Sequence, residues 1–128
     1  MPFGPHLMLE AYNCPPEVLN DANIAYKILD ELPEKIGMTK LIKPYVVFAD
    51  GNGEKDPGGW SGFVIIQESH ISLHTFIKRR FVTVDVYSCK DFDVDFAVQY
   101  FKDVFKTNDV DFITETRGKR YPPENIDE

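Results

Sequence analysis

The amino-acid sequence predicts an α+β domain, a two-layer sandwich in which two helices cover one face of a mostly antiparallel sheet. Two segments carry apolar residues at spacings of three and four, which is typical of amphipathic helices. The other apolar segments are short, rich in β-branched and aromatic residues, and joined by short links. Strands joined in that way are expected to be antiparallel neighbours. With only two helices available, one face of the sheet is expected to stay open.

The N-terminal half is predicted to form a strand, a helix, a second strand and a loop. Pro33 is expected to interrupt the helix, and Gly37 is a plausible C-terminal stop. Because Pro44 has no backbone N–H to donate, it is expected to limit hydrogen bonding at the start of the second strand. These elements are expected as strands over 6–13 and 41–49, a helix from residue 20, and a loop dense in turn residues over 50–59.

The C-terminal half is predicted to contain four strands and the second helix. The helix places six apolar residues on one face, and the polar segment after the last strand is expected to be loose. The strands are expected over 61–67, 70–76, 81–89 and 110–116, with the helix over 95–106 and its apolar face made by Phe96, Ala97, Tyr100, Phe101, Val104 and Phe105.

Composition excludes several classes of protein. The length of 128 residues and a hydrophobic content of 43% predict a single domain over 1–128. No apolar run approaches the roughly 20 residues needed to cross a bilayer, so a soluble cytoplasmic protein without a membrane partner is expected. The net charge of −7 disfavours nucleic acid as a partner. Cys14 and Cys89 form no C-x-x-C pair, so neither a disulfide framework nor a zinc site is predicted.

The segment "QESHISLHTF" gathers the side chains that suggest chemistry. Glu68, His70 and His74 resemble metal ligands in type, but residues four apart on a strand lie about 13 Å apart, too far to share an ion. No metal site is therefore predicted. The alternative interpretation is that the serines and histidines are polar positions of an edge strand.

Strand register relates this segment to other candidates. If the chain turns at Glu68–Ser69 and again within residues 77–80, paired residue numbers sum to about 157, which places Cys89 opposite Glu68 or Ser69. Ser61 and His74 lie eight and five residues from Ser69, about 26 and 16 Å along straight strands. A two-fold partner on the open sheet face could bring its own Ser61 and His74 to this Ser69.

The motif carries a family resemblance. "ESHISLHTF", "VDVYSC", "SGFVIIQ" and "HLMLEAYNC" resemble the bacterial and archaeal S-adenosylmethionine decarboxylase proenzymes, over residues 6–118. The resemblance implies self-cleavage between Glu68 and Ser69 into 1–68 and 69–128. It also implies a pyruvoyl group derived from Ser69, with no pyridoxal phosphate and no metal. The expected assembly is a homodimer or a dimer of cleaved heterodimers, and the expected substrate is S-adenosylmethionine, decarboxylated to the aminopropyl donor for spermidine.

The resemblance also implies the role of each residue. Ser69 would attack the Glu68 carbonyl, become the pyruvoyl group and later form a Schiff base with the substrate. His74 would be the proton acceptor in processing, and Ser61 would steady the cyclic intermediate. Cys89 would be the proton donor to the product.

Other residues are less closely tied to the chemistry. Phe63 and Phe76 are candidate substrate-binding residues that could stack on an adenine or could belong to the core. Cys14 and His6 are expected to be structural.

One departure from the family concerns substrate recognition. Where relatives continue the motif with Pro-Glu, this chain has Ile77 and Lys78, so a carboxylate that would hold the ribose is replaced by an ammonium. Arginine or ornithine decarboxylation by the same chemistry is therefore an alternative function. An uncleaved, non-catalytic homologue is a further alternative.

Overall fold

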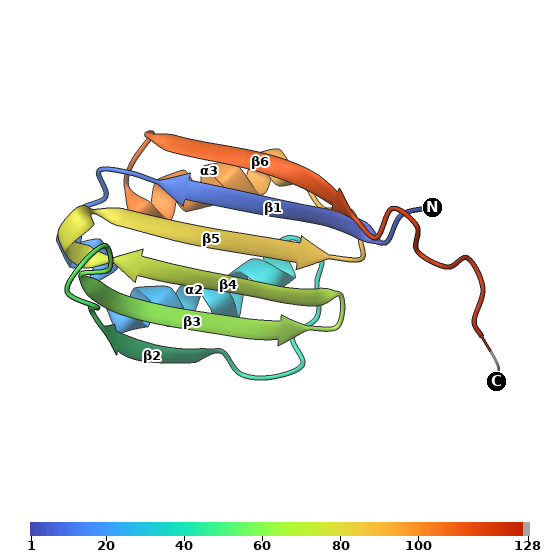
Figure 1. The fold of residues 1–128 in the computed structure, drawn as a ribbon, viewed down its shortest axis with the longest axis horizontal. Helices are drawn as coiled ribbons and strands as arrows, with labels where there is room; N and C mark the ends of the chain where they lie inside the picture. The colour runs from blue at the N-terminus through green and yellow to red at the C-terminus, as the bar shows by residue number, and fades with distance from the viewer. Residues whose placement is uncertain (127–128) are drawn as a thin grey trace.

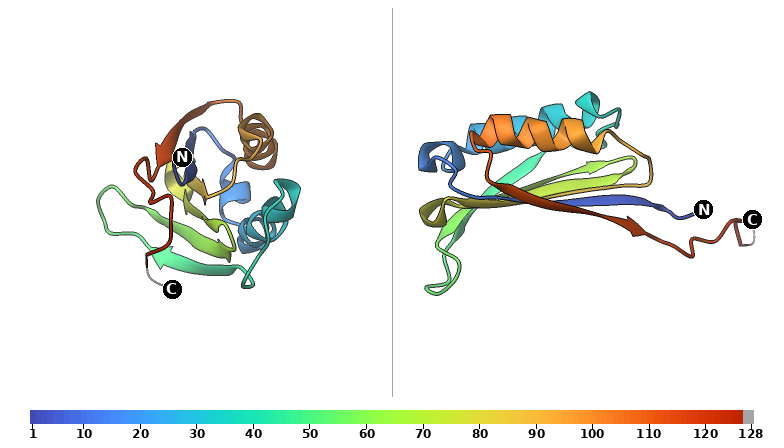
Figure 2. Two further views of the ribbon diagram at one scale, coloured as in Figure 1. Left: turned by 90° about the vertical axis from the view of Figure 1, so that its right-hand side faces the viewer. Right: turned by 90° about the horizontal axis from the view of Figure 1, so that it is seen from above.

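The structure is a computed structural model that describes residues 1–126; positions 127 and 128 of the predicted domain lie outside the described residues. Six strands form one antiparallel sheet, and both long helices lie on one face of it (Figures 1 and 2), which confirms the predicted α+β class. The elements are β1 (Gly4–Ala11), α1 (Pro16–Leu19), α2 (Ala22–Lys35), β2 (Tyr45–Asp50), β3 (Gly58–Ile66), β4 (Ser69–Phe76), the short 3₁₀ turn η1 (Ile77–Arg79), β5 (Phe81–Ser88), α3 (Val94–Phe105) and β6 (Val110–Arg117).

Helix α2 begins and ends as its sequence suggests, but the expected break at Pro33 is wrong. The Asp21 side chain accepts hydrogen bonds from two backbone N–H groups and caps the first turn. Pro33 lies inside the last turn with its side chain buried, so packing offsets the one backbone hydrogen bond that proline cannot donate. Gly37 adopts a positive φ of 79°, and the Met38 N–H donates to the Pro33 carbonyl. That pair of features ends the helix as a Schellman motif.

Four further details differ from the expected elements. The short helix α1 was not predicted; Pro16 opens it, with the fixed φ that suits a first helical position. Strand β1 begins two residues earlier than expected, and β2 begins only after Pro44. Phe96 is 42% exposed, so it does not share the buried face of α3 as predicted. The buried residues of that helix are Ala97, Val98, Phe101 and Phe105.

The order of strands across the sheet is β2-β3-β4-β5-β1-β6. The N-terminal strand β1 therefore lies between β5 and β6, directly beside the last strand of the chain (Figure 1). Alternate residues of each central strand face the helices, as shown by the buried sequence positions Leu7 and Leu9 in β1 and Ile71 and Leu73 in β4. The residues between them, such as Ser72, belong to the opposite, open face.

The predicted register of the second hairpin is confirmed. Strands β4 and β5 pair Ser69 with Ser88 and Phe76 with Phe81, and both pairs of numbers sum to 157. The first turn differs by one residue, because Ser69 already pairs with Ile66 and the two-residue loop is 67–68. Within residues 1–126, no helix has the length and apolar character needed to cross a membrane.

Candidate active site

The Glu68–Ser69 peptide lies at the tight turn between β3 and β4, and its carbonyl is already hydrogen-bonded. The backbone N–H of Cys89 donates to the Glu68 carbonyl oxygen at 2.9 Å. Ser69 has a φ of 154°, a value that residues with a side chain rarely adopt. The Glu68 carboxylate accepts from the Thr39 backbone N–H at 3.1 Å, which attaches the turn to the segment after α2. This peptide bond is thus polarised and conformationally strained.

The two cysteines differ in environment. Cys89 follows β5 directly and is exposed. The register prediction placed it opposite Glu68 or Ser69, and it lies beside Glu68. Close approach of β1 shapes this corner: a Cβ added at Gly4 would lie 2.0 Å from the Ser88 carbonyl oxygen. Cys14 is buried, and burial raises the pKa of its thiol to about 11. Cys14 therefore stays protonated, which agrees with a structural role, whereas the Cys89 thiol is accessible.

A polar cluster lies next to this corner on the open face. Register places His70 and His6 on either side of Tyr87, and His6 Nε2 lies 2.8 Å from Asp85 Oδ1. The guanidinium of Arg117 stacks over the Tyr87 ring at 4.1 Å. The sequence predicted only a structural role for His6. The structure adds that the Asp85 carboxylate on the open face holds it, although the two residues are 79 positions apart in the sequence.

The pKa of His70 is lowered from its usual 6.5, first by partial burial and then by the neighbouring His6 and Arg117, while Asp85 opposes the shift. Since the folded state holds fewer protons on His70 than the unfolded chain, this residue contributes stability above pH 6.5 that is lost as the pH falls through the lowered pKa. We expect His70→Gln to reduce the loss of unfolding free energy between pH 7.5 and mildly acidic pH. Urea midpoints measured across this range would show it, and parallel curves for the two proteins would contradict it.

Ser61 and His74 form a second polar pair, farther along the same hairpin. They are direct cross-strand partners, and Ser61 Oγ lies 2.8 Å from His74 Nδ1. When Nδ1 carries the hydrogen and donates to Ser61, Nε2 keeps the lone pair that can accept a proton. A cavity of about 270 Å³ adjoins the pair and is also lined by Phe63, Tyr45 and Val47. Five residues of strand separate this pair from Ser69, so one chain does not bring them together.

This pair was not foreseen, although the sequence carries its signal. In an antiparallel hairpin, all paired residue numbers have the same sum. The numbers 61 and 74 have the same sum as the pair Ile66 and Ser69 beside the turn, so strand register alone predicts the Ser61–His74 pair. The core alternative for Phe63 is wrong, because its side chain is 39% exposed on the open face. Phe76 also belongs to that face and packs against Phe81 with ring centroids 5.5 Å apart. Within residues 1–126, no three His, Cys, Asp or Glu side chains group to hold a metal ion.

Known proteins provide a separate comparison. The family model described as "S-adenosylmethionine decarboxylase" matches residues 5–118. The S-adenosylmethionine decarboxylase proenzyme of Thermosipho melanesiensis is 32% identical over 119 residues, which cover 91% of this chain and 85% of the relative. The proenzyme of Pyrococcus horikoshii is 36% identical over 105 residues, 81% and 70% of the two chains. The crystal structure of the Aquifex aeolicus adenosylmethionine decarboxylase superposes with a TM-score of 0.78 at 23% identity, over 98% of each chain, and thus shares the fold.

Proposed function

The chain belongs to the S-adenosylmethionine decarboxylase family, and from that premise we propose that it cleaves itself at Glu68–Ser69 and decarboxylates S-adenosylmethionine with the pyruvoyl group so formed. The family's reaction is that of a carboxy-lyase. The observation that carries the proposal is the hydrogen bond of 2.9 Å from the Cys89 N–H to the Glu68 carbonyl. The same N–H would stabilise negative charge developing on that oxygen during attack.

Processing needs only groups of the chain itself and one water molecule. Ser69 Oγ attacks the Glu68 carbonyl carbon, the peptide C–N bond breaks, and an ester with a free Ser69 amine forms. A base then removes the Ser69 Cα proton while the bond between Ser69 Cβ and the ester oxygen breaks, which leaves the Glu68 carboxylate and a dehydroalanine. Water hydrolyses the dehydroalanine, through its imine, to a ketone and ammonia. After cleavage, Ser69 would be the first residue of the new chain. It lies at the turn, half-buried and with a strained backbone, where a break in the chain is expected to relieve the strain.

The pyruvoyl group would supply the carbonyl that accepts electrons when CO₂ leaves. His74, oriented by Ser61, is the proton acceptor of processing, and the exposed Cys89 thiol is the proton donor to the product. No metal is invoked in these steps. A cytoplasmic location remains a prediction.

We propose that the active form is a face-to-face dimer of cleaved chains. The open sheet face carries large apolar side chains that are 38% to 58% exposed. They are Tyr45, Val47, Phe63, Ile65 and Ile113. By contrast, central residues of the face under the helices, such as Leu7 and Leu73, are fully buried. A two-fold axis crossing β4 between Ile71 and Ser72 would set Ser69 of each chain over His74 of the other, since those positions are equidistant from it. Each active site would then take half of its residues from each copy.

Two measurements test the function. Mass spectrometry of the purified protein should show two fragments, 1–68 and 69–128, and a chain that remains at 14.7 kDa would refute self-processing. Release of labelled CO₂ should be fastest from S-adenosylmethionine. Faster release from arginine or ornithine would establish the alternative suggested by Lys78. A chain that stays uncleaved and releases CO₂ from none of the three would favour the uncleaved, non-catalytic alternative.

Replacing Cys89 should separate processing from turnover. In Cys89→Ala the backbone N–H to Glu68 remains, so we expect cleavage to proceed while CO₂ release falls about 100-fold or more for want of the thiol. Fragment masses and CO₂ release, measured on one preparation, would show the split. The matched control is Cys14→Ala, which removes the buried cysteine and should keep the activity per cleaved chain. Equal activity of Cys89→Ala and the parent would eliminate the thiol as proton donor.

A further inference from the structure

A buried serine, Ser88, lies at the reactive corner and takes no part in the proposed steps of the chemistry. It directly precedes Cys89, pairs with Ser69 across the sheet, and is 0% exposed. Among residues 1–126, Thr75 is the only other buried polar side chain. Serine is mostly exposed in proteins, and burying a hydroxyl is costly unless it is hydrogen-bonded. The hydrogen bonds of Ser88 therefore indicate what it does.

The Ser88 hydroxyl closes a small ring with the backbone of Lys90. Its Oγ accepts from the Lys90 N–H at 2.9 Å and donates to the Lys90 carbonyl oxygen at 2.7 Å. The contact of 3.6 Å to Met38 Sδ is longer and involves a weaker acceptor. A serine hydroxyl bonded to the backbone two residues later forms a local turn. Because Cys89 lies inside this turn, the ring restricts its backbone torsion angles and so sets the direction of its N–H.

Gly4 confines the other end of the same peptide unit. The Ser88 carbonyl and the Cys89 N–H belong to one planar peptide, so a shift of the carbonyl also moves the N–H. A Cβ at Gly4 would overlap that carbonyl oxygen and would lie 2.7 Å from Cys89 Cα, closer than real Cβ atoms approach. The N–H donates to the Glu68 carbonyl at 2.9 Å. The peptide that donates to the scissile carbonyl is therefore held from both ends.

The segment between α2 and β2 joins this peptide to the scissile turn. The Lys90 Nζ donates to the Gly37 carbonyl at 2.9 Å. Two residues after Gly37, the Thr39 N–H donates to the Glu68 carboxylate at 3.1 Å, and the Thr39 carbonyl accepts from the Gln67 N–H at 2.8 Å. One short segment thus contacts both sides of the reactive corner.

We propose that Ser88 is a positioning residue for self-cleavage: its hydroxyl holds the Cys89 N–H against the Glu68 carbonyl oxygen, where negative charge develops during attack. The inference rests on the proposed function, because it gives Ser88 a part in the first step of processing. A donor that is already in place stabilises this charge without reorganising during the reaction. Without the hydroxyl, the Lys90 N–H and carbonyl lose their partner, and the turn is no longer fixed.

Removing the hydroxyl should slow cleavage and leave the fold intact. The full-length Ser88→Ala chain, made by cell-free synthesis, should release fragment 69–128 about tenfold or more slowly than the parent. Ser88→Thr keeps an Oγ, so it should restore most of the parent rate. The parent rate in Ser88→Ala would overturn the proposal, and so would a Ser88→Thr chain that is cut as slowly as Ser88→Ala.

Thr107 provides the matched control, because it makes the same pattern of bonds beyond the opposite end of β1. Its Oγ accepts from the Asp109 N–H at 3.1 Å and donates to the Tyr12 carbonyl at 2.7 Å. Thr107→Val removes this hydroxyl and should lower the urea midpoint while keeping the parent rate of cleavage. Equally slow cleavage of Thr107→Val would show that general destabilisation is the cause and would overturn the role of Ser88.

Gly4→Ala tests the same peptide from its other end and leaves Ser88 unchanged. Its Cβ would displace the Ser88 carbonyl and with it the Cys89 N–H, so cleavage should again be about tenfold or more slower. Circular dichroism would establish that each variant is folded, and Gly4→Ala decides the question if Ser88→Ala does not fold. The parent rate in folded Gly4→Ala would show that cleavage does not depend on the position of this peptide.

Hydroxylamine shows which step is slowed, because it cuts an ester faster than a peptide bond. The products are a hydroxamate on Glu68 and a Ser69 with free hydroxyl and amine. His74→Ala should form the ester without eliminating it and should be cut, whereas Ser88→Ala should form little ester and stay whole. Rapid cutting of Ser88→Ala would place its defect after the attack and overturn the proposal. A parent chain that is never cleaved would instead refute self-processing itself, so the two failures are distinct.

Discussion

A Ser69→Ala chain is expected to remain whole and inactive. Alanine has no oxygen to attack the Glu68 carbonyl and none to leave in the elimination, so neither the ester nor the new ketone can form. The purified variant should keep its mass of 14.7 kDa, and CO₂ release from S-adenosylmethionine should fall about 10³-fold or more, to background.

The control for this variant is Thr114→Ala, which removes an exposed hydroxyl of the edge strand β6 and should be cleaved like the parent. Circular dichroism would establish that both variants are folded. Fragments of 1–68 and 69–128 in Ser69→Ala would contradict the assignment of the nucleophile, whatever the activity.

Mixing two inactive chains is expected to restore cleavage. Ser69→Ala lacks the nucleophile and His74→Ala lacks the proton acceptor, so each alone should stay uncut. In a mixed dimer, the intact Ser69 of the His74→Ala chain faces the intact His74 of its partner. If pairing is random, about half of the His74→Ala chains should be cut. A purification tag on one chain makes the two masses distinguishable in the spectrum.

The reciprocal mixture serves as the control. A chain carrying both substitutions, co-expressed with the parent, gives mixed dimers in which the parent Ser69 faces a partner without His74. We expect the parent chain in those mixed dimers to stay uncut. Cleavage there, with none in the first mixture, would show that His74 acts within its own chain and would eliminate the shared site.

Local patterns predicted much of the fold and one half of the candidate site. Alternation and tight turns fix how strands pair, so the sum of paired residue numbers predicted Cys89 opposite Glu68 or Ser69, and the structure has it beside Glu68. The same arithmetic would have paired Ser61 with His74, but only once the turn was set at 67–68 instead of one residue later.

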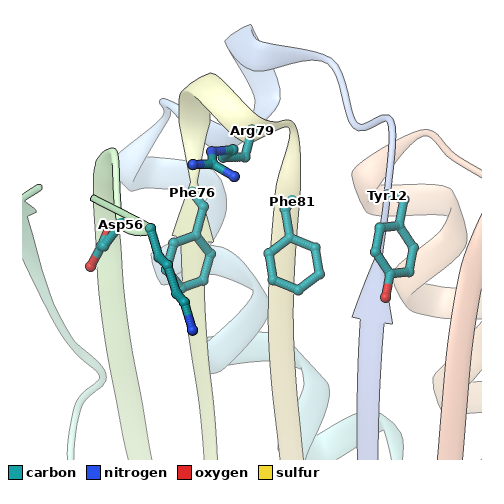
Figure 3. A pocket seen from close by; sticks show the side chains of 6 residues that line it. Tyr12, Asp56, Phe76, Arg79 and Phe81 are labelled. Atoms are coloured by element: carbon teal, nitrogen blue, oxygen red, sulfur yellow. The ribbon is translucent and has the colours of Figure 1, made fainter. Parts of the chain in front are cut away.

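Other features depend on contacts that are distant in the sequence. Whether Pro33 breaks a helix depends on the packing around it, and the Pro33 side chain is buried. The cavity of about 550 Å³ at the η1 end of the sheet (Figure 3) needs Tyr12, Lys55 and Phe76 from three separate regions of the chain. The loop that carries Lys55 is shaped by the Asn52 side chain, whose oxygen accepts from two backbone N–H groups, and that geometry has no periodic signal.

The position of β1 between β5 and β6 decides what the cut does to the molecule. Fragment 1–68 would contribute β1, β2 and β3, and fragment 69–128 would contribute β4, β5 and β6, so the two pieces are interleaved. Separating them would break the ladders that join β1 to β5, β1 to β6, and β3 to β4. The pieces should therefore stay together after cleavage. Once denatured, however, they would have to meet again by diffusion, so the mature protein is a heteromer whose assembly was completed while it was still a single polypeptide.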